Sequence, residues 1–220
     1  MYATSLLFLA LPLAARAHFV LRYPTPFGPS AANEETAPCG GYSFSENTPV
    51  TNFHVEGDSI AYASSHPDVK VLYRVVQGNK ADGSNLEWDQ VLPIIQQFGS
   101  GSFCEPAVTV PSSYAGKSGI LQVVQNAVDG MLYACAYVKF VPGKGTPPSV
   151  CMNDTGVDAE FASDASLSAL MSGGGSSPSG SQSAGGPSST NSPSSASLQS
   201  LSIFGCIIGA AVALAFNVGL

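Results

Sequence analysis

The chain has 220 residues and carries fifteen acidic against eight basic side chains, which gives a formal net charge of −7 with neutral histidines. An acidic protein lacks the cationic surface that phosphate binding requires, so a nucleic-acid partner is excluded. Apolar runs at both ends of the chain point to processing signals, which must be set aside before the fold is considered.

Residues 1–17 have the features of a secretory signal peptide. An apolar run over residues 6–13 is followed by the small-residue exit Ala15-Arg16-Ala17. Cleavage there would make His18 the first residue, with an α-amine beside its imidazole. These two nitrogens can chelate one metal ion, and a second histidine would complete a T-shaped site of three nitrogens that suits copper.

The expected domain spans residues 18–158, a length that can bury one core. Short β-type runs dominate it, separated by Gly, Pro, Asn and Asp. We expect strands at residues 18–23, 52–55, 59–63, 69–76, 107–110, 119–126 and 131–141. Residues 89–98 are expected to contain a short helix broken by Pro93. Residues 24–47 are expected to form a long loop pinned by Cys39, in which adjacent Glu34 and Glu35 are solvated.

The last two predicted strands flank Asp129-Gly130, a dipeptide typical of hairpin turns. Side chains alternate between the faces of a strand, so residues 131–141 present one wholly apolar face and one mixed face. The apolar face holds Leu132, Ala134, Ala136, Val138 and Phe140, and the mixed face holds Tyr133, Cys135, Tyr137 and Lys139. Several short strands in a compact length predict an all-β fold, an antiparallel β-sandwich.

Five cysteines divide into two groups. Cys206 lies in the apolar tail, which leaves an even set in an oxidising compartment: Cys39, Cys104, Cys135 and Cys151. We expect two disulfides, and all three pairings stay open. A four-thiolate metal site is disfavoured because no Cys-x-x-Cys occurs. The sequon Asn153-Asp154-Thr155 predicts a glycoprotein.

The chain after the domain predicts an anchor. Residues 159–200 form a Ser/Gly/Pro-rich linker, expected to be a disordered stalk, and residues 201–220 form an apolar tail. No Lys or Arg follows Lys144, so the tail lacks the basic flank of a membrane-spanning helix. The pattern favours a GPI-anchor signal with its attachment residue within 185–194.

Two histidines compete to be the second copper ligand. His66 precedes Pro67 in a loop between predicted strands, where a stiffened backbone can present its side chain. His54 lies within a predicted strand, where packing is a sufficient explanation. We therefore expect His66 to join His18.

Several spaced motifs together resemble a known family. They are His18-Phe19-x-Leu21-x-x-Pro24, Pro38-Cys39-Gly40-Gly41, His66-Pro67 ahead of Leu72-Tyr73-Arg74, and Leu132-Tyr133-x-Cys135-Ala136. The chain is similar to fungal copper-binding proteins related to lytic polysaccharide monooxygenases, the group that includes the BIM-type copper acquisition factors. The resemblance implies an immunoglobulin-like β-sandwich, a GPI anchor, and one Cu(II) held by the N-terminal amine and by two histidines that match His18 and His66.

One position departs from the family pattern. The family places an Asp two residues after the strand cysteine as a copper ligand, and this chain has Tyr137 there. Tyr137 is expected to be a weak axial ligand. Packing against Tyr133 is an alternative role for it, and Asp129 or water are alternative ligands.

Three functions follow from these expectations. The first is capture or transfer of Cu(II) at the outer face of the plasma membrane or in the cell wall, with a membrane copper importer or a wall polysaccharide as partner. The second is a copper-dependent monooxygenase acting on a wall glycan, which Tyr137 favours. The third is a metal-free structural protein of the wall. The resemblance favours copper binding without polysaccharide cleavage.

Overall fold

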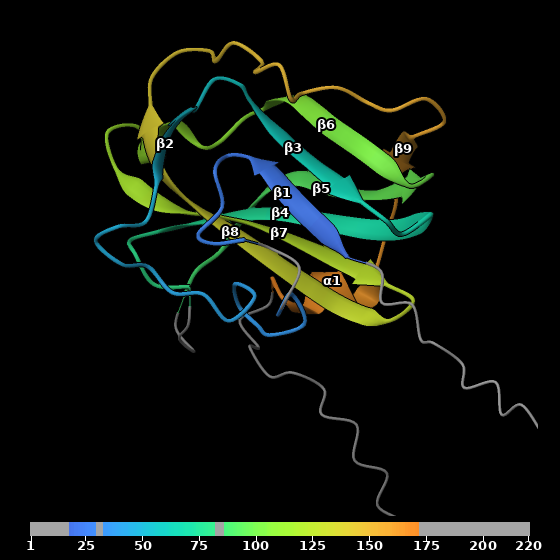
Figure 1. The fold of residues 1–220 in the computed structure, drawn as a ribbon. Helices are drawn as coiled ribbons and strands as arrows, with labels where there is room; N and C mark the ends of the chain where they lie inside the picture. The colour runs from blue at the N-terminus through green and yellow to red at the C-terminus, as the bar shows by residue number, and fades with distance from the viewer. Residues whose placement is uncertain (1–17, 30–32, 82–85, 172–220) are drawn as a thin grey trace, which may run out of the picture. The chain divides into compact units, whose positions relative to one another are not determined.

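The computed structural model describes residues 18–29, 33–81 and 86–171. Strands dominate these residues (Figure 1). They are β1 (Phe19–Tyr23), β2 (Val50–His54), β3 (Asp58–Ser64), β4 (Asp68–Gln77), β5 (Asp89–Phe98), β6 (Gly101–Val108), β7 (Ser118–Ala127), β8 (Gly130–Val141) and β9 (Asp158–Phe161). A 3-10 turn, η1 (Ser112–Tyr114), and a short helix, α1 (Ala165–Ala169), complete them.

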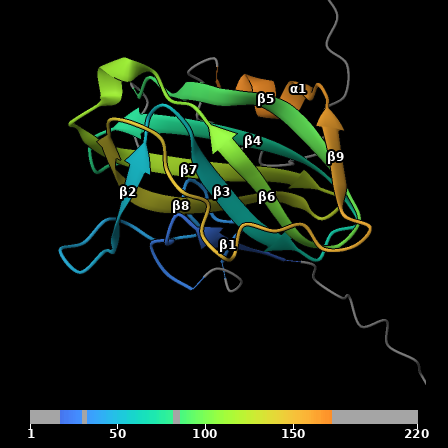
Figure 2. The ribbon, with the colours of Figure 1, turned by 90° about the horizontal axis from the view of Figure 1, so that it is seen from above.

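The strands form two sheets that pack face to face. One sheet has the order β1-β3-β6 and the other β2-β8-β7-β4-β5-β9. Figure 2 shows β1, β3 and β6 as one layer over the longer sheet. The predicted all-β sandwich is confirmed, with one departure from a wholly antiparallel fold. Strand β2 pairs with β8 in parallel, which is possible because β2 and β8 are joined by a long connection rather than by a hairpin.

The core lies between the sheets, and the alternation of β8 builds it as expected. Its predicted apolar face is buried: Leu132, Ala134, Ala136, Val138 and Phe140 are all at most 4% exposed. The facing layer contributes Phe19 from β1 and Tyr62 from β3, whose rings meet edge to face. Because β1 is fixed by this packing, the position of the residue just before it is fixed too.

The prediction of a helix at residues 89–98 is wrong, because this segment is β5. It pairs with β4 on one side and β9 on the other. The register slips between the pairs Tyr73–Leu92 and Val71–Ile95, so Pro93 stands at a bulge. The N–H that Pro93 lacks is not needed there for the ladder of hydrogen bonds.

The predicted hairpin of β7 and β8 is present, but its turn begins one residue earlier than the dipeptide indicated. Ala127 pairs with Gly130, which leaves Val128 and Asp129 as the turn residues. Gly130 has a φ of +127°, a conformation that side chains disfavour. The shift places Asp129 at the tip of the hairpin.

Two disulfides form, as expected, and the structure resolves their pairing as Cys39–Cys135 and Cys104–Cys151. The first bond ties the loop that follows β1 to β8. Two backbone hydrogen bonds also join this loop to β8, from Phe27 N–H to the Cys135 carbonyl at 2.9 Å and from Tyr133 N–H to the Glu34 carbonyl at 2.7 Å. The loop thus takes the place of a neighbouring strand along the first half of β8.

The folded part continues past residue 158, where the sequence suggested a flexible linker. Strand β9 pairs with β5, and the fully buried Leu167 of α1 packs on the outer face of the longer sheet. Asp164 caps α1 by accepting the Leu167 N–H at 2.9 Å. The predicted signal peptide, attachment region and apolar tail lie outside the described residues. Within the described ranges no helix is long and apolar enough to cross a membrane.

Candidate metal centre

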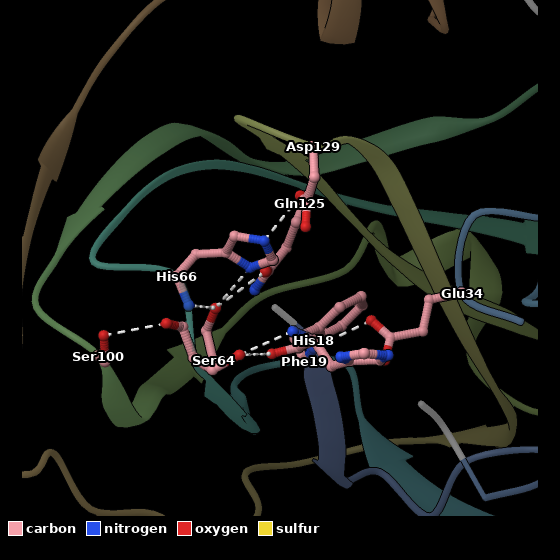
Figure 3. Close-up of polar contacts among 9 residues, drawn as sticks. His18, Phe19, Glu34, Ser64, His66, Ser100, Gln125 and Asp129 are labelled. Carbon is pink, nitrogen blue, oxygen red and sulfur yellow. Dashed lines mark hydrogen bonds and ion pairs between the residues drawn. The ribbon is translucent and has the colours of Figure 1, made fainter. Parts of the chain in front are cut away.

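Strand pairing brings the first residue of the predicted processed chain beside the loop that carries His66. Phe19 pairs with Ser64, so His18 faces Ser65. The His18 carbonyl accepts the Ser65 N–H at 2.9 Å and the Ser65 hydroxyl at 2.9 Å. The backbone N–H of His18 donates to Ser65 Oγ at 2.7 Å. The backbone nitrogen that cleavage would convert to an amine therefore lies next to the residue preceding His66 (Figure 3).

His66 is buried and held at both ring nitrogens. Its exposed fraction is 1%. Nε2 lies 2.8 Å from Asp129 Oδ1, and Nδ1 lies 3.5 Å from Ser64 Oγ. The Asp129 side chain is 32% exposed, because it stands on the hairpin tip. The pair combines an enclosed imidazole with a carboxylate that solvent can reach.

Glu34 completes the group from the opposite side, as Figure 3 shows. It is 4% exposed. Its Oε2 accepts the Phe19 N–H at 2.9 Å. Its Oε1 is buried and has no hydrogen-bond partner within the described part of the chain.

The pKa of Glu34 reflects all of its neighbours. Burial is the largest influence and holds the pKa above its ordinary value; the Phe19 N–H, His18 and His66 lower it, and Asp129 raises it. Three charged or titratable groups from separate segments thus act electrostatically on Glu34.

This donor set fits a copper ion. Imidazole and amine nitrogens are preferred ligands of Cu(II), and a carboxylate adds an anionic oxygen. A buried carboxyl oxygen without a hydrogen-bond donor is costly unless a cation or donor reaches it. Among the described residues, no three side chains of His, Cys, Asp or Glu are grouped so as to hold a metal. The side chains of His18, His66 and Asp129 therefore do not form a closed group of three ligands in this structure.

Sequence comparison then identifies the family. The model of a family described as "Copper acquisition factor BIM1-like" matches residues 16–156. This chain belongs to that family. The finding confirms the resemblance inferred from the motifs, and it makes a copper-related role the functional class of the chain.

Two relatives of this BIM1-like chain are named for their likeness to lytic polysaccharide monooxygenases. "Lytic polysaccharide monooxygenase-like protein X325" of Yarrowia lipolytica is 33% identical over 179 residues, 77% of this chain and 67% of the relative. "Lytic polysaccharide monooxygenase-like protein ham-7" of Neurospora crassa is 30% identical over 190 residues, 72% of this chain and 81% of the relative.

A solved structure of the glycoside hydrolase family 61 member Cel61B from Hypocrea jecorina matches 48% of this chain and 58% of its own. It is 12% identical, with a TM-score of 0.30. A likeness at this level carries no argument about the fold or the function.

The structure of this BIM1-like domain does not bring Tyr137 to the histidines. Its ring packs on Phe44, with ring centroids 4.4 Å apart, on the outer face of β8 beside the Cys39–Cys135 disulfide. At about 3.3 Å per strand residue, the distance along β8 from the hairpin tip exceeds roughly 20 Å. The sequence offered packing against Tyr133 as the alternative role, whereas the ring that Tyr137 contacts is Phe44.

His54 is not part of the group either. Its Nδ1 lies 2.7 Å from Asp58 Oδ2 and its backbone N–H donates to the same oxygen at 2.8 Å. This pair lies where β2 leads into β3, at the opposite end of β3 from Ser64. The structure therefore groups His18 with His66, the histidine that the sequence favoured.

Sequence reasoning missed Glu34, because adjacent acids in a polar loop are usually solvated. The expectation is correct for Glu35, which is exposed, and wrong for Glu34, which is buried. The motif Pro38-Cys39-Gly40-Gly41 holds the only signal that could have found it. A cysteine and two glycines a few residues after an acid indicate a tightly folded loop rather than a solvated one.

Proposed function

We propose that this protein is an extracellular copper-binding protein that binds Cu(II) through the His18 amine and imidazole, the His66 imidazole and the Asp129 carboxylate. The observation that carries the proposal is the pairing of β1 with β3. It sets the His18 backbone nitrogen against Ser65, while the next residue, His66, lies 2.8 Å from Asp129. The family of the chain supports copper as the cargo.

The contacts of His66 support its role as a ligand. A ring nitrogen that binds a metal carries no proton, so the proton must lie on the other nitrogen. If His66 binds through Nε2, the proton lies on Nδ1, where Ser64 Oγ at 3.5 Å can accept it. The hydrogen bond to Asp129 is then given up, which leaves its carboxylate next to the ion as an oxygen ligand.

The proposal includes the site of action and the partners. Removal of residues 1–17 creates the amine ligand, and a GPI anchor within 185–194 holds the protein at the outer face of the plasma membrane. A site that is reached from solvent through Asp129 suits capture of copper and its transfer to a membrane importer, or storage against a wall polysaccharide. Turnover is not required for either role.

Copper titration of the secreted, processed protein tests the proposal. His66→Ala should weaken Cu(II) binding by more than the roughly 10- to 100-fold caused by loss of an outer-shell partner. One extra residue before His18 should do the same, because it converts the amine to an amide. His54→Ala is the matched control and should leave the affinity unchanged. Equal affinity of His66→Ala and the unaltered protein contradicts the proposal.

Acidification gives a second readout. Copper must displace protons from the amine and both imidazoles, so its affinity should fall as the medium turns from neutral to mildly acidic. A fluorescence titration at several pH values measures this dependence. An affinity that is constant over this range would count against nitrogen ligands.

The monooxygenase alternative has lost one of its two supports. It was based on the histidine brace and on a tyrosine near the copper, and Tyr137 packs on Phe44 instead. Oxidised oligosaccharides, released from wall glycans by the copper-loaded protein and a reductant, would still establish that activity.

A further inference from the structure

The side chain of Glu34 lies next to His18, the first residue of the proposed processed chain. The contacts of its loop fix it in this position. The Glu34 carbonyl accepts the Tyr133 N–H at 2.7 Å, which fixes the loop to the edge of β8. Gly40 has a φ of +64°, and a Cβ atom there would lie 3.1 Å from the Tyr133 carbonyl oxygen and 3.6 Å from Glu34 Cα. A glycine is needed at this position for the backbone to close on Glu34.

The side chain of Glu34 is fixed by contacts of its own. Oε2 accepts the Phe19 N–H at 2.9 Å, which joins the loop to the first residue of β1. The neighbouring cysteine, Cys39, is cross-linked to Cys135 of β8. A carboxyl group held from both sides in this way keeps its orientation when His18, the residue before β1, carries a free amine.

If the side chain only held β1 in place, an ionised carboxylate would carry an unnecessary desolvation cost. A neutral glutamine has the same length and its carbonyl oxygen accepts the same Phe19 N–H. Burying an ionised carboxylate is unfavourable unless a cation or several donors compensate for it. Since Oε1 has no donor among the described residues, a cation bound at the site would supply this compensation.

We propose that Glu34 is a positioning residue that orients the first residue and supplies a buried negative charge matched to Cu(II) rather than to Cu(I). This inference rests on the proposed copper site. Cu(II) carries two positive charges, which the carboxylates of Asp129 and Glu34 neutralise together. With Cu(I) the same two carboxylates leave one excess negative charge in a largely buried site, and this is unfavourable. Glu34 therefore favours binding of the oxidised ion over the reduced one.

The test compares Glu34→Gln with Glu35→Gln in the secreted, processed protein at neutral pH. Both changes remove one negative charge, but Glu35 is exposed. Affinities for Cu(II) and Cu(I) are measured by competition with a chromophoric chelator specific for each ion. Glu34→Gln should weaken Cu(II) binding by roughly tenfold or more, the effect that a nearby opposite charge has on proton binding, and should change Cu(I) binding much less.

A difference in affinity between the two ions is also a shift in reduction potential. A tenfold selective loss of Cu(II) affinity raises the potential by about 59 mV for a one-electron couple, which voltammetry of the copper-loaded protein measures. Electron paramagnetic resonance should still show three nitrogen ligands in Glu34→Gln, because His18 and His66 remain. A role confined to holding β1 would change neither the potential nor the preference for Cu(II).

Two results overturn the inference. One is a Cu(II) affinity of Glu34→Gln equal to that of Glu35→Gln. The other is an equal loss for both ions, which would mean that the side chain acts only on the shape of the site. Both presuppose tight copper binding that His66→Ala abolishes. If His66→Ala binds copper normally, the proposed copper site itself fails, and the two failures are thereby distinguished.

Discussion

The protein contains two histidine–aspartate pairs that are alike in geometry and opposite in burial. His54 Nδ1 lies 2.7 Å from Asp58, and His66 Nε2 lies 2.8 Å from Asp129. In the first pair the aspartate is enclosed, with a side chain 1% exposed, and the histidine is 32% exposed. In the second pair the histidine is 1% exposed and the aspartate 32%.

The contacts of the two carboxylates explain the difference. Asp58 accepts hydrogen bonds from two backbone N–H groups, those of His54 and Ser59, and from the Tyr23 hydroxyl. Its acceptor capacity is used inside the protein, so it stabilises the connection between β2 and β3. Asp129 stands on a hairpin tip near His18, Glu34 and His66. The same two residue types thus form a structural contact at one end of β3 and a candidate metal site at the other.

The largest expected effect is on stability at the enclosed pair. Asp58→Asn replaces one carboxylate oxygen by an NH2 group that faces the donors of His54, Ser59 or Tyr23. Buried donors left without an acceptor cost about 1–3 kcal/mol each, so we expect a loss of about 2 kcal/mol or more in the free energy of unfolding. Urea denaturation measures it. Copper affinity of the folded protein should not change.

The same substitution at the other pair should change copper affinity and leave stability nearly unchanged. Asp129→Asn should weaken Cu(II) binding by roughly tenfold or more, since the anionic oxygen is lost. It should change the free energy of unfolding by less than about 1 kcal/mol, because pairs open to solvent contribute little. Chelator competition and urea denaturation measure the two quantities. If both substitutions lowered the free energy of unfolding and neither changed copper affinity, the distinction between a structural pair and a metal-binding pair would be wrong.

The smallest expected effect is a change in the response to alkali. Burial raises the pKa of Tyr23 from 10.0 to about 12, and the charge of Asp58 and the hydrogen bond to it add to this shift. A raised pKa in the folded state contributes stability that is complete below pH 10 and is lost as the pH rises through about 12. The free energy of unfolding of Tyr23→Phe should therefore fall less steeply over this interval.

Other buried tyrosines also have raised pKa values, among them Tyr62, Tyr73 and Tyr114. They are present in both proteins, so the difference between the two unfolding curves isolates Tyr23. Parallel curves from pH 9 to pH 12 would show that the Tyr23–Asp58 contact does not contribute in this way.

Local patterns predicted most strands of the sandwich. The apolar face of β8 and the hairpin with β7 follow from alternation and a turn dipeptide, which involve neighbours in sequence. β5 was misjudged because Pro93 removes both helical and strand signals locally, and only its pairing with β4 and β9 shows that the proline stands at a bulge. The extent of the domain was missed for a similar reason. The serine-rich stretch around Leu167 is held by burial of that leucine and by hydrogen bonds to Arg74 and Asn126 from distant strands.

The grouping of residues at the candidate site was predicted in part. His18 and His66 were chosen from the expected processing and from the loop position, and the structure places them together. Asp129 was weighed only as an alternative, since its turn dipeptide already explained it. Glu34 was dismissed as solvated, and Tyr137 was preferred on its position in a motif. Both misjudgements concern side chains whose surroundings come from distant segments.

The sequence alone determined the class of fold, the number of disulfides and the family, because periodicity, composition and spaced motifs are properties of the chain itself. The tertiary structure decided which histidine meets which carboxylate. It also paired the cysteines and buried Glu34 under the first residue of β1. The physical reason is that burial and charge proximity arise between segments far apart in the chain, where no local pattern records which side chain will be enclosed.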